Sequence, residues 1–427
     1  MRNGVFLVAL AAVVVSMAGV AQGDPVPVNL VIKGGDALGG STVSTLNSPF
    51  TDGHGKVGFV GALADDQRFV WHDTGPIFFS GSALPVVLTG GESTMGVSNS
   101  GGFIYSPSAD GNDAVWTQGG GLLVEGQTLV NYPDLYSVFN SRPTMLPNGT
   151  AYWIGGTRLE DQTSTSNRHL LRASDPTNPA TITTVLSGGD IIEGKAIKTT
   201  ATNFTYWVSN NGLHHIHRLE METGSTNNDM HMYVDGAFVA QEGQPTGQGD
   251  NWAGFSSVSI NDFGNYVFSG DTSGPVATDA FVAYNGNIVV REGDTLDGIL
   301  LASGYAVRDL SINKWGRVVH MWGTSTTEFL FFGEAADLSA SQLLLRTGDQ
   351  IDVDGDTVAD FTVYDFKASS VVGPGLDLAE DGWVYVEADI DPVGGGTRVE
   401  AILGIWIPEP ATLGLLLLGG VLVLRRR

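Results

Sequence analysis

The stretch INDFGNYVF at residues 260–268 decides the fold, and INKWGRVV at residues 312–319 repeats its plan. In both stretches one apolar run ends, a polar turn containing Gly follows, and a second apolar run begins. Asn, Asp and Gly between apolar runs are the strongest short-range signal for a β-hairpin. Looser copies of this hairpin turn centre on Gly55, Gly101, Gly149, Gly212 and Gly382. The chain therefore predicts one hairpin in each of several similar units.

A second element runs in step with the hairpin turn, and we call it the Gly-acid element. It is a short β-type run followed by Gly and then Asp, Glu or Gln. Its copies are Gly35-Asp36, Gly91-Glu92, Gly126-Gln127, Gly189-Asp190, Gly243-Gln244, Gly293-Asp294 and Gly348-Asp349. Gly permits a positive φ angle, and the side chain after it can cap backbone N–H groups. We interpret the element as a structural turn rather than as a row of acidic ligands.

A third apolar run lies between these two elements in most units. Its copies include residues 69–71, 114–116, 231–233, 281–283, 329–331 and 401–403. Each unit then holds about four short strands, and helical periodicity is scarce between residues 24 and 407. Four-stranded units of roughly fifty residues are typical of propeller blades, so we predict an all-β, seven-bladed β-propeller. A β-helix or two packed sandwiches are the alternatives.

The phase of the repeat predicts how the ring closes. The first Gly-acid element stands alone near the N-terminus, preceded by residues 30–32, whereas the last unit ends near Trp406 without one. Residues 30–32 should therefore be the outer strand of the final blade, paired in one sheet with residues 401–405. Such closure leaves no open end of the ring.

The two termini have the composition of targeting segments. Arg2, an apolar core at residues 5–20 and the small residues Ala21-Gln22-Gly23 predict a signal peptide over residues 1–23, with an uncleaved N-terminal anchor as the alternative.

The C-terminus reads Pro408-Glu409-Pro410, an apolar run over residues 411–424, and Arg425-Arg426-Arg427. Its fourteen residues, all apolar or Gly except Thr412, are fewer than the about twenty that a membrane-spanning helix needs. The arginines should stay cytoplasmic. The tail is thus either a permanent single-pass anchor or a transient signal that is cut near the Pro-Glu-Pro.

This tail resembles the PEP-CTERM sorting signal, which an exosortase-type membrane protease processes. The resemblance covers residues 408–427, and all three parts occur in order. Residues 24–407 resemble uncharacterised repeat regions of secreted PEP-CTERM proteins. The resemblance implies export across the inner membrane, transient membrane association through the tail, and a final place on the cell surface or outside the cell. It implies no activity.

Charge and composition limit the partners. The chain carries a formal charge of −25 and has no Cys, so thiol chemistry and Cys-based zinc sites are excluded. Without residues 1–23 and 411–427, which hold four arginines and no acids, 17 basic and 46 acidic residues remain, a net −29. Such a surface repels nucleic acid and attracts divalent cations. We expect no nucleic-acid partner.

One acidic loop suggests a cation site. Asp352, Asp354, Asp356 and Asp360 alternate with other residues around Gly355. Carboxylates spaced in this way can surround Ca²⁺, which takes six to eight oxygen ligands. The spacing departs from the EF-hand loop because no Glu stands at the twelfth position. The alternative is an acidic hairpin tip in solvent.

Histidines give a weaker signal. His214, His215 and His217 follow Gly212 on an expected strand, where alternation puts His215 and His217 on one face. With His231 nearby in the chain they could hold a metal, but no spaced carboxylate partner is evident, so strand-surface or packing roles are favoured. Tryptophans such as Trp153, Trp207 and Trp383 lie beside expected strand ends. They are either core residues or aromatic faces for sugar rings.

No nucleophile elbow, P-loop, dinucleotide fingerprint or HExxH motif occurs in the sequence. We predict a non-enzymatic cell-surface or extracellular-matrix protein that binds polysaccharide or divalent cations. The alternatives are a propeller-type carbohydrate-active enzyme, either glycosidase or lyase, and an envelope assembly scaffold. A central pocket with bare aromatic side chains and with carboxylates facing each other about 5–9.5 Å apart would favour the enzyme. A plugged channel with polar faces would favour the matrix protein or the scaffold.

Overall fold

The computed structural model describes residues 24–80, 87–89, 95–129, 132, 134–139, 143–199, 204–367 and 375–407. The expected signal peptide (1–23) and sorting tail (408–427) lie outside these residues. Within the described ranges, helices with the length and apolar character needed to cross a membrane are not found.

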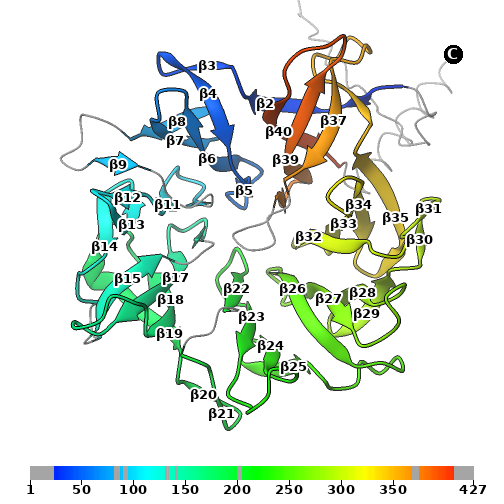
Figure 1. Ribbon diagram of the computed structural model, residues 1–427. Coiled ribbons are helices and arrows are strands. Elements are labelled where there is room, and N and C mark those ends of the chain that lie inside the picture. The colour runs from blue at the N-terminus through cyan, green and yellow to red at the C-terminus, as the bar shows by residue number, and fades with distance from the viewer. Residues whose placement is uncertain are drawn as a thin grey trace, which may run out of the picture.

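The described chain is a β-propeller built almost wholly from strands, as predicted (Figure 1). Its regular helix content is one 3₁₀ turn, Pro179–Thr181. Seven of its sheets have four or more strands, and they follow one another around a ring in chain order (Figure 1). We number them sheets 1 to 7. The ring excludes both the β-helix and the pair of sandwiches.

Three neighbouring sheets have the four-strand plan in its simplest form. Sheet 4 contains β22 (Thr205–Val208), β23 (His215–Glu220), β24 (Met230–Val234) and β25 (Ala237–Gln241). Sheet 5 contains β26 (Trp252–Ile260), β27 (Tyr266–Thr272), β28 (Ala280–Tyr284) and β29 (Asn287–Arg291). Sheet 6 contains β32 (Ala306–Ile312), β33 (Arg317–Gly323), β34 (Glu328–Glu334) and β35 (Asp337–Arg346). In each sheet the strand order follows the chain order, so consecutive strands are hydrogen-bonded neighbours.

The earlier sheets add short strands to the same plan. Sheet 1 contains β3 (Ala37–Leu38), β4 (Ser41–Leu46), β5 (Phe50–Thr51), β6 (Val57–Leu63), β7 (Arg68–His72) and β8 (Gly75–Phe79). Sheet 2 contains β9 (Leu88–Thr89), β10 (Met95–Val97), β11 (Phe103–Tyr105), β12 (Ser108–Ala109), β13 (Asn112–Thr117) and β14 (Gly120–Val124). Sheet 3 contains β15 (Leu135–Phe139), β16 (Thr144–Met145), β17 (Ala151–Arg158), β18 (Asn167–Ala173) and β19 (Ile182–Ser187). Two separate hairpins precede sheets 4 and 6: β20 (Ile191–Ile192) with β21 (Lys195–Ala196), and β30 (Thr295–Leu296) with β31 (Ile299–Leu300).

Sheet 7 joins the two ends of the described chain. It contains β36 (Gln350–Asp352), β37 (Phe361–Phe366), β38 (Leu376–Leu378), β39 (Trp383–Pro392), β40 (Val399–Trp406), β1 (Val26–Pro27) and β2 (Asn29–Lys33). Strand β2 pairs antiparallel with β40, with Leu30 opposite Leu403 and Ile32 opposite Ile402. This pairing confirms the predicted closure of the ring by residues 30–32, and the two strands lie side by side in Figure 1.

The hairpin turns have the geometry that their sequence predicts. The seven turn glycines (Gly55, Gly101, Gly149, Gly212, Gly264, Gly316 and Gly382) all have φ between 73° and 95°. The turn after β26 shows why this matters: the Gly264 N–H donates to the Asn261 carbonyl at 3.0 Å. The Asn261 side-chain oxygen also accepts from the backbone N–H groups of Phe263 and Asn265, both at 3.0 Å. A left-handed residue is needed to close such a turn, and Gly takes that conformation without strain.

The Gly-acid elements are the turns that leave the outer strands. Their described glycines have positive φ, and Asp36, Asp190, Asp294 and Asp349 each accept a hydrogen bond from the backbone N–H three residues earlier. The Gln127 amide oxygen accepts the same bond from Val124. The copy at Gly91-Glu92 lies outside the described residues. These contacts agree with the structural interpretation of the element.

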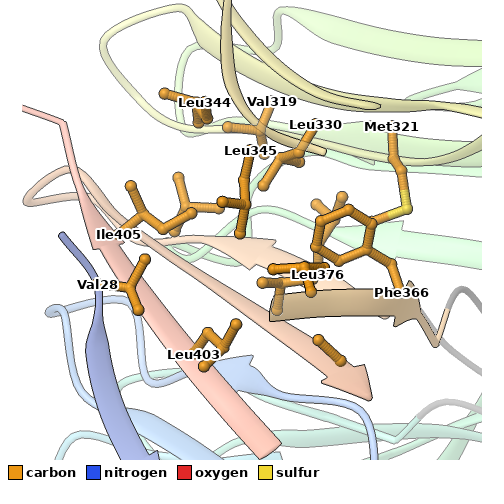
Figure 2. Packing of buried hydrophobic residues seen from close by; sticks show 14 of the residues in the cluster. Val28, Val319, Met321, Leu330, Leu344, Leu345, Phe366, Leu376, Leu403 and Ile405 are labelled. Atoms are coloured by element: carbon orange, nitrogen blue, oxygen red, sulfur yellow. The ribbon is translucent and has the colours of Figure 1, made fainter. Parts of the chain in front are cut away.

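The hydrophobic core is divided among the spaces between neighbouring sheets. Figure 2 shows the cluster between sheets 6 and 7, where Leu330 and Leu345 meet Leu376 and Leu403. Val28 of the N-terminal segment joins the same cluster and is 8% exposed. The N-terminus is therefore attached by apolar packing as well as by backbone hydrogen bonds.

Candidate functional site

The hairpin turns gather at one end of the propeller axis and surround a cavity of about 500 Å³. We call this cavity the channel mouth. Its walls are Gly53, His54, Pro147, Asn210, Asn211, Asp262, Lys314, Trp315, Glu380 and Asp381. The residues come from the hairpin turns of six sheets. In a propeller the first strand of each sheet is innermost, so the turn that follows it lies at the end of the axis.

A second, smaller cavity adjoins the mouth along the axis. Among the described residues it measures about 30 Å³, which is room for about one water molecule. The buried Asp377 carboxylate lines this cavity and joins three sheets. It accepts from the backbone N–H of Thr51 at 2.8 Å, from the Thr51 hydroxyl at 3.0 Å and from the Ser311 hydroxyl at 3.0 Å. We call the channel mouth together with its walls the cup.

Glu380 forms the floor of the cup and is 8% exposed. One of its carboxylate oxygens accepts from the backbone N–H of Lys314 at 2.8 Å, and the other accepts from the Asn210 side-chain amide at 2.9 Å. Burial raises the pKa of Glu380, and the nearby Asp262 carboxylate adds to the rise despite these hydrogen bonds. Because both oxygens are held by donors from other sheets, Glu380 ties the turns of sheets 4, 6 and 7 together.

The rim of the cup presents aromatic surface. Trp315 is 57% exposed, although its indole N–H donates to the Glu380 carbonyl at 3.0 Å. The Lys314 ammonium lies 5.0 Å from the centre of the Trp315 ring, a cation–π contact. Phe263, at the matching position of the preceding turn, is 70% exposed. The ring of Trp315 is thus fixed in direction and open to solvent.

Carboxylates line the cup beside these rings. Asp262 accepts from the backbone N–H of Asn211 at 2.7 Å. Asp381 is exposed overall, but the surrounding turns partly desolvate its carboxylate, which raises its pKa, and the Asp52 carboxylate adds to the rise. A Cβ atom on Gly55 would overlap the present position of the Asp381 carboxylate, and the φ of 95° at Gly55 itself favours Gly. The cup offers fixed hydrogen-bond acceptors next to an aromatic face.

The structure brings together three of the four aspartates of the predicted calcium loop. Carboxylate oxygens of Asp352, Asp354 and Asp356 lie within 4.8 Å of one another. Asp360 is not in this group and accepts from the backbone N–H of Val353 at 2.8 Å. Burial raises the pKa of Asp352, but backbone N–H donors led by Gly355 outweigh this and lower it. Calcium binding by this loop stays a prediction.

The histidines do not converge on one point. His215 and His217 share a face of β23, as predicted, with their rings stacked 5.9 Å apart. His214 bonds instead to Asp235, with 2.8 Å between the His214 Nδ1 and a carboxylate oxygen. His231 is buried against Tyr233 on β24, and its Nδ1 lies 3.1 Å from the Tyr233 hydroxyl. Burial lowers the pKa of His217 to about 3, so its imidazole is neutral at pH 7.

The tryptophans divide between core and channel. Trp153 is fully buried, and Trp383 is half-buried with its ring stacked on Tyr385. Trp207 is half-buried beside the narrow part of the axis. Trp315 was not named from the sequence as a candidate for sugar binding, although Trp315 belongs to the stretch at 312–319. The signal was present: Trp315 and Phe263 both stand immediately before a turn Gly, where the side chain faces solvent.

Comparisons with known proteins show no matching family model and no matching curated protein. Among solved structures, the chain is similar to prolyl oligopeptidase B from Galerina marginata, with 10% identity, 86% of this chain and 52% of that chain covered, and a TM-score of 0.44. It is also similar to the WD40 β-propeller domain of Doa1, with 8% identity, coverage of 90% and 98%, and a TM-score of 0.41. A third similarity is to the polysaccharide lyase Uly1, with 11% identity, coverage of 75% and 58%, and a TM-score of 0.30. The chain spans about half the length of the prolyl oligopeptidase. All three TM-scores are below 0.5, so the propeller assignment depends on the sheets of this chain alone. No function of these proteins is transferred to it.

Proposed function

We propose that this chain is an exported, non-enzymatic, seven-bladed propeller of the cell surface or extracellular matrix, and that it binds polysaccharide at the channel mouth. One observation carries the proposal. The Trp315 ring, 57% exposed, stands at the edge of a cavity of about 500 Å³ whose walls come from the hairpin turns of six sheets.

The chemistry of this cup suits a sugar. The apolar face of a pyranose ring packs on an indole, and sugar hydroxyl groups need closely placed acceptors and donors. Asp262, Asp381 and Asn211 supply such groups around Trp315. The indole N–H is already bonded to the Glu380 carbonyl, so the ring does not have to be ordered when the ligand binds.

Export is the second part of the proposal. It depends on the signal-peptide pattern at 1–23 and on the resemblance of residues 408–427 to a PEP-CTERM signal. An exosortase-type protease would be the processing partner. The acidic mature chain, with no Cys, is compatible with a place outside the cell.

Binding without catalysis is favoured by how the buried carboxylates are used. Both oxygens of Glu380 are held by Lys314 and Asn210, and Asp377 is bonded to Thr51 and Ser311. A glycosidase needs one carboxyl to protonate the leaving oxygen and a second, facing it, to act on the sugar or on water. Glu380 and Asp377 instead act as structural ties between the sheets.

The test is a binding assay with the full-length chain against immobilised polysaccharides of neutral, amino and uronic types. Trp315→Ala should weaken binding to the best ligand about fivefold to 150-fold, if a sugar on an indole gains as much as a nucleic-acid base on an aromatic side chain, about 1–3 kcal/mol. Phe238→Ala is the control, since Phe238 is 42% exposed on the outer strand β25, away from the mouth. Equal losses in the two variants would contradict the site. Release of reducing ends from any polymer would contradict the non-enzymatic assignment.

A further inference from the structure

We propose that the channel mouth selects a polysaccharide with free amino groups, of the de-N-acetylated hexosamine type, over neutral and uronic acid polymers. This inference rests on the proposed function, since it names the class of sugar that the same cup takes. It is carried by the charges of the cup and by their position around one aromatic ring.

The cup holds more carboxylates than cations. Asp262, Glu380 and Asp381 line it, and among the described residues none of the three has a Lys, Arg or His side chain within salt-bridge distance. Lys314 and His54 are the basic side chains in the same wall. The Lys314 ammonium lies 5.0 Å from the centre of the Trp315 ring, and its charge also acts to lower the pKa of Glu380 and Asp381. With the three acids and Lys314 ionised and His54 neutral, three negative charges meet one positive charge.

The hydrogen bonds around these carboxylates leave their charge unbalanced. Asp262 accepts from the Asn211 backbone, and Glu380 accepts from a backbone N–H and a neutral amide. Neutral donors orient a carboxylate but do not cancel its charge. A ligand ammonium in the cup would supply the balancing positive charge. Its hydrogen bonds to the carboxylates would be stronger than hydrogen bonds between neutral groups.

Trp315 adds a second preference in the same direction. The face of an indole attracts a cation, and this attraction is strongest where water is partly excluded. An amino sugar can therefore place its ring on Trp315 while its ammonium meets the carboxylates. A uronic acid would bring a carboxylate to the same place and would be repelled.

The charge of the whole molecule acts at longer range. At −25 the chain attracts a polycation and repels a polyuronate before contact. This long-range attraction is common to the whole surface, so it cannot by itself assign the site. The local effect must be measured by removing individual charges from the cup.

The experiment measures three soluble probes by calorimetry at pH 6 and about 0.1 M salt: glucosamine hexamer, N-acetylglucosamine hexamer and galacturonate hexamer. The full-length chain should bind the glucosamine hexamer at least about tenfold more tightly than the N-acetylated hexamer, and the galacturonate hexamer most weakly. Asp262→Asn and Asp381→Asn should each reduce the preference for the free amine about threefold to tenfold, and binding of the N-acetylated hexamer should change little.

Asp161→Asn is the matched control, because it removes the same charge from the exposed turn between β17 and β18, at the end of sheet 3 opposite its hairpin turn. If Asp161→Asn lowers the preference as much as the mouth variants do, the selection is by net charge and the inference is wrong. If the glucosamine and N-acetylglucosamine hexamers bind equally, and Trp315→Ala weakens both, the inference is wrong but the proposed function stands. If no saccharide binds, both are wrong.

Discussion

Replacing Glu387 by Gln should stabilise the protein at neutral and alkaline pH. Glu387 lies on β39 of sheet 7, the sheet that closes the ring, and is 7% exposed. Across the neighbouring strands Asp365, Asp389 and Glu400 stand directly opposite one another in a row of three acids. Lys367, directly after β37, partly balances these acids, and its ammonium lies 2.8 Å from an Asp389 carboxylate oxygen. Glu387 is two residues before Asp389 on the same strand, so it shares a face with this row and the charges of Glu400 and Asp389 act on it. Like charges close together in a sheet are destabilising, so protonation of Glu387 relieves repulsion.

The size of the effect follows from proton binding. Burial, and secondly the charge of Glu400, raise the pKa of Glu387 from 4.5 to about 8. Between these two values the folded protein binds a proton that the unfolded chain has lost. The free energy of unfolding is therefore highest, as far as Glu387 is concerned, below pH 4.5. This stability is lost as the pH rises through 8. At about 1.4 kcal/mol per pH unit, the raised pKa lowers the free energy of unfolding by about 3 kcal/mol at pH 7 and by about 4–5 kcal/mol at pH 9, compared with acid pH.

The assay is urea unfolding at pH 5, 7 and 9, read as the free energy of unfolding. Gln has the shape of a protonated Glu but does not ionise, so the Glu387→Gln variant should gain about 3 kcal/mol over the native chain at pH 7 and more at pH 9, with a gain below about 1 kcal/mol at pH 5. Other titrating groups, including the buried Glu328, are common to both proteins and cancel in the difference. Glu160→Gln, at an exposed turn, is the control and should change stability by less than about 0.5 kcal/mol at every pH.

Two results would refute this reasoning. The first is a difference between the native chain and Glu387→Gln that does not grow from pH 5 to pH 9, which would mean that Glu387 does not hold a proton in the folded state. The second is a variant less stable than the native chain at all three pH values, which would mean that the sheet needs the carboxylate.

Gly316→Ala should lower the free energy of unfolding by about 1 kcal/mol, because the φ of 81° at this position strains any residue with a Cβ even though no neighbour lies within 4 Å. The control is Gly75→Ala, at a position with equally open space but without a positive φ, and equal losses in the two variants would contradict the argument. Changing Asp354 and Asp356 to Asn should abolish most of any Ca²⁺-dependent rise in melting temperature, and a native chain that melts alike in chelator and in calcium would show that the loop is only an acidic turn. Intact-mass measurement of the protein from its native host should show that residues 411–427 are absent, and a mature species that retains Arg427 would contradict the processing signal.

The sequence by itself determined the repeated local structure. A polar turn with Gly needs a left-handed residue and flanking strands, and these requirements involve only neighbours in the chain. Gly264 and Gly316 therefore identified hairpins correctly. The Gly-acid element at Gly35 also predicted the closure of the ring. It stands alone at the start of the chain, whereas the last unit lacks one, so the N-terminal strand before Gly35 had to complete the last sheet.

Only the tertiary structure decided which side chains meet. Asn210 and Glu380 are 170 residues apart and bond across the axis, because both lie in turns that follow innermost strands. Asp365, Asp389 and Glu400 form a row because of the register of three strands, and a shift of one residue would turn the side chains to the other face. Trp315 is a binding candidate because its turn ends at the mouth. Turn chemistry is set by adjacent residues, whereas the site is set by strand order and register, which involve residues far apart in the chain.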